Sequence, residues 1–185
     1  MTVVPLDTDH SGVQRLDGRL RDLLAGKKIV MTGVTGFIGE QLLWKILTEL
    51  PDTVPAVLVR RKGSATARDR MVSAIKKPIF NALRDAAGGA AELLDSRIEV
   101  IEGDLPNVPE LPADLDVVVH CAGDVSFDPP IDQALTTNVI GTKALMDRML
   151  QAVSDENGDP RTVPHYVHIS TAYTAGRRRG AILEA

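Results

Sequence analysis

Residues 28–39 of the chain read KIVMTGVTGFIG, a short and nearly unbroken apolar run followed by a loop that holds three glycines. Such a run is typical of a strand buried on both faces of a parallel sheet. The residues that follow, 37–50, place isoleucine and leucine at helical spacing until Pro51 ends the helix. The order of strand, glycine loop and helix predicts a βαβ unit with a phosphate site at the helix N-terminus.

The three glycines have different expected roles in holding a dinucleotide. Gly33 permits the tight turn after the strand, Gly36 lets a pyrophosphate approach the backbone, and Gly39 lets helix and strand pack closely. A glycine-rich turn without a ligand is the alternative, and a Walker-type phosphate loop is excluded because no Gly-Lys-Ser/Thr follows. The loop residues expected to contact the cofactor are Gly33, Thr35, Gly36, Phe37, Ile38 and Gly39.

Further apolar runs alternate with helical patterns along the rest of the chain. Strands are expected at 56–59, 97–101, 116–120 and 165–170, with one helix or two over 66–87, a brief helical turn near Leu94, and a helix over 131–152. The expected core positions of the last helix are Leu135, Val139, Leu145, Met149 and Val153. Because parallel strands are joined by right-handed crossovers, the fold class is α/β, a doubly wound parallel sheet of the Rossmann type with strand order 3-2-1-4-5.

The polar, irregular residues 1–26 are expected to be a leader on the domain edge, with a short helix within 13–24. Ordered structure is expected to begin at Lys27, so that 27–185 form a partial dinucleotide-binding domain that stops before the later strands. The length of 185 residues suits one domain.

The amino-acid composition argues against several classes of function. With 3% aromatic residues and a net charge of −4, the chain is not expected to bind nucleic acid. The one cysteine, Cys121, excludes an intrachain disulfide and a multi-cysteine metal site, and the four scattered histidines indicate no metal ligands. No apolar run approaches the roughly 20 residues of a transmembrane helix, and no signal peptide is evident, so we expect a cytoplasmic protein.

The end of the second strand predicts which cofactor is preferred. An NAD-preferring site carries an acidic residue about 20 residues beyond the glycine loop, where its carboxylate binds the ribose. This chain instead has Arg60, Arg61 and Lys62 there, with no carboxylate until Asp69. Guanidinium groups suit a 2′-phosphate, so NADPH is expected over NADH. A solvated basic loop is the alternative.

The ends of the third and fourth strands offer further cofactor contacts. Asp104 is expected to accept a hydrogen bond from the adenine amino group and Leu105 to line the ring, unless Asp104 is an ordinary turn residue. The small residues Cys121, Ala122 and Gly123 let the backbone pass close to the cofactor. Because no base accompanies Cys121, a reactive thiol is disfavoured.

These pieces together resemble the N-terminal half of fatty acyl-CoA reductases, a branch of the extended short-chain dehydrogenase/reductase superfamily, and thioester reductase domains of carboxylic acid reductases are similar. The matching stretches are TGVTGFIG at 32–39, LVR at 58–60, GDL at 103–105, HCAGDVSF at 120–127, NVIGT at 138–142 and HISTAY at 168–173. The VSF and STAY sequences favour acyl reductases over sugar-nucleotide epimerases, which usually carry an acidic residue after the second strand.

The resemblance implies hydride transfer from NADPH to the carbonyl of an acyl thioester, bound to coenzyme A or to a carrier protein, giving an aldehyde and possibly an alcohol. It implies that Thr171, or the adjacent Ser170, polarises the carbonyl, and that Asn138 structures the catalytic end, where it is expected to contact the cofactor. A strand-end hydroxyl that merely caps the turn is the alternative for Thr171.

The family's catalytic Tyr-x-x-x-Lys pair has no match in this chain. Tyr166 is followed by Ser170, and Tyr173 by Arg177, which fails because Gly176 interrupts any helix and arginine does not titrate as lysine does. The segment alone is therefore expected to be inactive and to need a C-terminal half. The alternatives are a non-catalytic dinucleotide-binding module, used as a sensor or scaffold, and another extended reductase-type enzyme such as a sugar-nucleotide epimerase or dehydratase.

Overall fold

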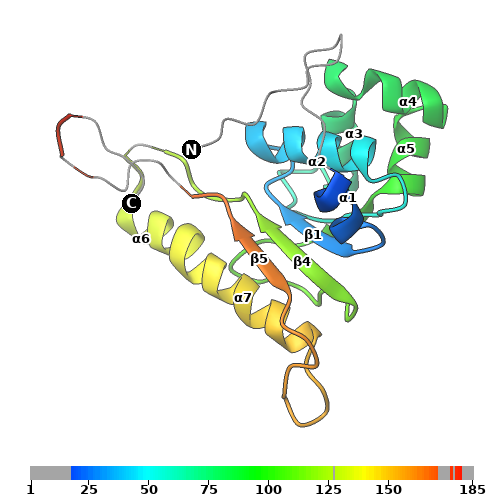
Figure 1. The fold of residues 1–185 in the computed structure, drawn as a ribbon. Coiled ribbons are helices and arrows are strands. Elements are labelled where there is room, and N and C mark those ends of the chain that lie inside the picture. Colours follow the sequence, from blue (N-terminus) through cyan, green and yellow to red (C-terminus); the bar gives the residue numbers. More distant parts are fainter. Residues whose placement is uncertain (1–17, 127, 171–175, 177, 181–185) are drawn as a thin grey trace.

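A computed structural model describes residues 18–126, 128–170, 176 and 178–180 of the chain. Its centre is a sheet of five parallel strands in the order β3-β2-β1-β4-β5 (Figure 1). The strands are β1 (Lys28–Thr32), β2 (Ala56–Val59), β3 (Glu99–Glu102), β4 (Leu115–His120) and β5 (His165–His168). The predicted doubly wound α/β fold and its strand order are confirmed.

Helices cover both faces of this sheet, α6 and α7 on one side and α2 to α5 on the other (Figure 1). Their bounds are α1 (Gly18–Leu24), α2 (Phe37–Glu49), α3 (Ala67–Ile75), a 3₁₀ turn η1 (Pro78–Phe80), α4 (Asn81–Ala87), α5 (Ala90–Arg97), α6 (Ile131–Ala134), a π-helical segment η2 (Leu135–Ile140) and α7 (Gly141–Ala152). The pattern over 66–87 is therefore two helices, because Pro78 starts a new turn after α3 ends.

The core has two halves because alternate residues of each strand point to opposite faces of the sheet. Met31 and Val57 pack with α2, α3 and α5, whereas their neighbours Val30 and Leu58 pack with α7. All four side chains are buried, as the unbroken apolar runs predict for a sheet covered on both sides.

The segment over 131–152 corrects one prediction. Leu145, Met149 and Val153 are buried as expected, but Leu135 and Val139 are 48% and 57% exposed. The π-helical turns of η2 separate the two groups, and the Gly141 N–H donates to the Thr136 carbonyl five residues back. The helical period used for the prediction does not hold through a π-helical segment, so the core face changes there.

The element bounds differ in part from the predicted ones. The short helix expected within 13–24 is α1, and its last residue Leu24 packs against the core. The helical turn expected near Leu94 is the eight-residue helix α5. β3 begins two residues later than predicted, and β5 ends at His168, with one more sheet bond from the Ile169 N–H to the His120 carbonyl. In the described part of the chain, no helix has the length and apolar character needed to span a membrane.

Candidate functional site: a cleft at the carboxyl edge of the sheet

A cleft of about 680 Å³ opens where the carboxyl ends of β1, β2, β3 and β4 meet the start of α2. This is the edge at which doubly wound sheets bind ligands, next to the point where the strand order reverses. The predicted residues that line the cleft are Gly33, Thr35, Gly36, Phe37, Ile38, Gly39, Arg60, Asp104, Leu105, Cys121, Ala122 and Gly123. The topology therefore brings together loops that lie up to 90 positions apart in the sequence.

The glycine loop leaves no room for side chains at two positions. Gly33 has φ +72°, and a Cβ there would lie 2.6 Å from the backbone of Cys121 and Ala122. A Cβ on Gly39 would lie 2.3 Å from the Gly33 carbonyl oxygen. Gly36 directly precedes α2. Because glycine has no side chain, its backbone is not covered on the side of the cleft. The bare backbone at this helix start fits the diphosphate of a dinucleotide.

One guanidinium that sequence reasoning missed also borders the cleft. Arg70, on α3, donates through Nη2 to Thr35 Oγ1 at 3.1 Å and through Nη1 to the Arg60 carbonyl at 2.5 Å. These bonds tie α3 to the glycine loop and to the end of β2. A tight turn over 62–65, closed by two bonds between Lys62 and Ala65, separates β2 from α3, and no sequence motif marks Arg70.

The second predicted basic residue, Arg61, binds Glu102 and does not line the cleft. Its Nη1 donates to Glu102 Oε1 at 2.9 Å, and the residue is absent from the lining of the cleft. Glu102 also accepts a bond from the Ala67 backbone N–H at the start of α3, which lowers the pKa of Glu102 together with the Arg61 contact. The cleft is thus lined by Arg60 and Arg70 rather than by Arg60 and Arg61.

The opposite rim of the cleft is the loop 121–126 that follows β4. Burial raises the pKa of the Cys121 thiol, which keeps it protonated. Asn138, on η2, does not line the cleft, but its side chain brackets Asp124. The Asp124 N–H donates to Asn138 Oδ1 at 2.7 Å, and Asn138 Nδ2 donates to the Asp124 carbonyl at 3.1 Å. The bond from the Ser126 backbone N–H holds the pKa of Asp124 below its usual value.

The other predicted site residues differ in their exposure to solvent. Asp104 is exposed and accepts a bond from the Leu105 N–H at 2.9 Å, while Leu105 is buried. Ser170 is exposed two residues beyond β5, at the same edge of the sheet as the cleft. Thr171 lies outside the described residues, as do Tyr173 and Arg177.

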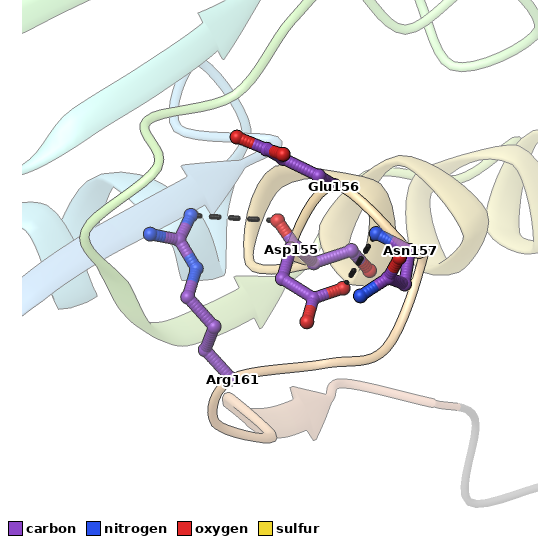
Figure 2. Close-up of a pocket in the computed structure, with 5 residues that line it drawn as sticks. Asp155, Glu156, Asn157 and Arg161 are labelled. Atoms are coloured by element: carbon purple, nitrogen blue, oxygen red, sulfur yellow. Dashed lines mark hydrogen bonds between the residues drawn. The ribbon is translucent and has the colours of Figure 1, made fainter.

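A second hollow of about 400 Å³ lies in the loop between α7 and β5 (Figure 2). The Arg161 guanidinium donates to the Ser154 carbonyl at 3.4 Å, and the Asn157 N–H donates to the Asp155 carboxylate at 2.9 Å (Figure 2). These contacts close the loop on itself. The polar groups of this loop bind one another, and the second hollow shares no residue with the cleft.

Comparison with known proteins shows the family to which the chain belongs. A family of NAD-binding domains described as male sterility protein matches residues 31–185. The chain belongs to this family. The predicted similarity to fatty acyl-CoA reductases is confirmed, since fatty acyl-CoA reductase 1 of Xenopus laevis is 31% identical over 163 residues. The alignment covers 83% of this chain and 30% of that protein, so the chain spans about a third of its relative's length.

Solved structures share the fold at lower identity. The thiolation-reductase di-domain of an archaeal non-ribosomal peptide synthetase is 22% identical with a TM-score of 0.61, covering 81% of this chain and 37% of that one. UDP-glucuronic acid 4-epimerase from Bacillus cereus is 23% identical with a TM-score of 0.56, covering 85% and 44%. The same fold thus carries different chemistry, and the choice between them depends on the site.

Proposed function

We propose that this chain is the NADPH-binding portion of an acyl-thioester reductase, which reduces a fatty acyl-CoA or a carrier-bound acyl group to an aldehyde or an alcohol. The observation that carries the proposal is the cleft, in which a bare glycine loop is bordered on the β2 side by two arginines, Arg60 and Arg70. The similarity to fatty acyl-CoA reductases supports the choice of substrate, because those relatives are named for that activity.

The cofactor preference rests on charge at the end of β2. Arg60 and Arg70 line the cleft, and the Arg60 carbonyl holds the Arg70 guanidinium at the rim. A guanidinium binds a phosphate dianion through two parallel hydrogen bonds and stays charged at any physiological pH. The two side chains therefore suit the 2′-phosphate of NADPH, whereas NADH offers them only a hydroxyl.

The other loops have distinct roles in the proposed complex. The backbone of 33–39 would hold the diphosphate, Asp104 and Leu105 the adenine, and loop 121–123 the ribose next to the nicotinamide. When bound, the dinucleotide supplies the hydride. Thr171, or the adjacent Ser170, would donate a hydrogen bond to the thioester oxygen, so that negative charge developing there is stabilised.

Calorimetric titration of the 185-residue chain with NADPH and NADH tests the cofactor assignment. We expect saturable binding of NADPH, with at least tenfold weaker binding of NADH. Arg70→Gln removes the charge but keeps a polar side chain, and it should weaken NADPH binding by about 10- to 100-fold, the value of one charge-assisted contact. NADH binding should weaken less, because NADH loses only the support that Arg70 gives to the glycine loop through Thr35.

Arg148→Gln is the matched control. Arg148 lies on α7, and its Nε donates to the Val108 carbonyl, away from the cleft. This variant should keep the NADPH affinity of the wild type. Equal affinity of the wild type for NADPH and NADH would contradict the 2′-phosphate assignment, and no binding of either would contradict the proposed function as a whole.

The substrate assignment needs hydride transfer as its readout. We expect no oxidation of NADPH by the 185-residue chain in the presence of a fatty acyl-CoA, because the chain holds no Tyr-x-x-x-Lys pair. Turnover by this segment alone would contradict that expectation. A longer protein containing this sequence should oxidise NADPH with a fatty acyl-CoA, and substitution of Thr171 by valine should then lower kcat.

A further inference from the structure

A chain of hydrogen bonds centred on a buried histidine joins the floor of the cleft to the helix behind it. Its centre is His120, the last residue of β4, whose side chain is fully buried. His120 Nδ1 lies 2.7 Å from Thr32 Oγ1 of β1, and His120 Nε2 lies 3.1 Å from Thr142 Oγ1 of α7. We call Thr32, His120 and Thr142 the histidine relay. Both ring nitrogens therefore have a hydroxyl partner, each from a different element.

The outer bonds of the histidine relay fix the direction of each proton. The Ala122 N–H donates to Thr32 Oγ1 at 3.1 Å, and the Thr142 hydroxyl donates to the Asn138 carbonyl at 2.8 Å. Because the single Thr142 proton is used in this way, His120 Nε2 must carry a hydrogen and donate it to Thr142. Nδ1 is then the acceptor for the Thr32 hydroxyl, so every group is satisfied by one neutral tautomer.

The two ends of the relay hold the loop that forms one wall of the cleft. At one end, Thr32 binds the Ala122 amide, and Ala122 lines the cleft. At the other end, the relay binds the carbonyl of Asn138, whose side chain brackets the backbone of Asp124 on both sides. A shift of the His120 ring therefore acts on both anchor points of loop 121–126.

A charged ring would break this arrangement. An imidazolium donates from both nitrogens, which leaves the buried Thr32 hydroxyl without an acceptor. From β5, His168 and Tyr166 face the ring with centroids at 5.1 and 6.1 Å, whereas β1 and α7 present the two threonine hydroxyls. Burial, with a smaller contribution from His168, lowers the pKa of His120 to about 4. The ring is neutral at physiological pH.

We propose that His120 is a positioning residue for dinucleotide binding, which acts as a neutral Nε2–H tautomer through Thr32 and Thr142 to fix loop 121–126 in its binding shape. The proposal rests on the proposed function, because the wall that it fixes belongs to the same cleft. His120 itself does not line the cleft, so its effect on affinity is exerted through the loop.

Three measurements on the 185-residue chain test the proposal. Nitrogen NMR of the wild type reports the His120 tautomer, amide hydrogen exchange reports the hold on Ala122 and Asp124, and titration reports the NADPH dissociation constant. Thr142→Val removes one relay hydroxyl, and we expect the dissociation constant to rise by up to about tenfold, the value of one part-buried hydrogen bond. Exchange at Ala122 and Asp124 should quicken while amides between β1 and β2 keep their protection.

Two further variants separate the relay from general stability. Thr142→Ser keeps the hydroxyl and should restore wild-type affinity and exchange. Thr48→Val makes the same substitution at an exposed position of α2 and should leave both unchanged. An Nδ1–H tautomer at neutral pH would overturn the proposal without recourse to any variant. So would a Thr142→Val protein that is less stable but keeps wild-type affinity and exchange. If the wild type binds no NADPH, the proposed function fails, whereas the tautomer and exchange measurements still decide the relay.

Discussion

The cleft has two walls that are held in different ways. The wall from β1 and α2 is backbone against backbone, with Gly33 and Gly39 so close to neighbouring main chain that neither tolerates a Cβ. The wall after β4 is held by side chains, through Thr32, His120 and Asn138. Backbone contact fails when an atom is added, whereas a side-chain network fails when one of its hydrogen-bonding groups is removed or changes its protonation.

The largest effect should come from adding a single carbon to the first wall. Gly33→Ala places a Cβ at φ +72° and 2.6 Å from the backbone of Cys121 and Ala122. Strain and overpacking together should lower the free energy of unfolding by about 2–5 kcal/mol. Urea denaturation measures this loss.

Gly63→Ala is the matched control for that substitution. Gly63 also has a left-handed φ, +59°, but nothing lies within 4 Å of its added Cβ. Only the backbone strain remains, so the loss should be about 1 kcal/mol. Equal losses in the two variants would mean that the backbone of the loop after β4 does not lie close enough to Gly33 to exclude a side chain.

An intermediate effect should come from acidifying the second wall. The pKa of His120 lies near 4 in the folded chain, below the ordinary histidine value of about 6.5. The unfolded chain therefore binds the extra proton first as the pH falls. The stabilisation by neutral His120 is complete above pH 6.5 and is lost progressively down to pH 4, by up to about 3 kcal/mol.

Thermal unfolding of the wild type and of His120→Asn across this pH range isolates that contribution. The variant should be less stable at pH 7, and the difference from the wild type should shrink as the pH falls to 4. Asp69, Asp95, Glu102, Asp116 and Asp124 also have lowered pKa values, but both proteins share them. A difference that stays constant with pH would exclude a neutral buried ring.

The smallest effect should come from the arginine outside the cleft. Arg61→Ala removes an exposed ion pair with Glu102, which solvent screening makes weak. The NADPH dissociation constant should stay within about twofold of the wild type, far less than for Arg70→Gln. If Arg61→Ala weakens NADPH binding as much as Arg70→Gln does, the role expected from the sequence belongs to Arg61.

The difference between the walls also explains which features of the fold and site could be predicted from the sequence. The glycine loop and the strand order could be predicted because glycine spacing and apolar runs are local patterns of the amino-acid sequence. The position of Arg70 depends on how α3 turns back toward Thr35, and the histidine relay joins three separate elements. Such contacts are set by tertiary packing, which sequence periodicity does not describe.

The exposed positions of Leu135 and Val139 have the same origin. The spacing of apolar residues over 131–152 fits a regular helix, and no sequence pattern predicts the π-helical turns of η2. This segment carries Asn138 into reach of Asp124. The departure from the predicted helix therefore serves the second wall of the cleft.

The central claim is that the backbone after β1 holds the diphosphate of a nicotinamide dinucleotide. Amide NMR of the chain during titration with NADPH tests it most directly. We expect saturable shifts concentrated at residues 33–39, with smaller shifts at 103–105 and 121–123. Saturable binding that leaves the amides of 33–39 unmoved would contradict the account, as would shifts gathered in the loop 154–161.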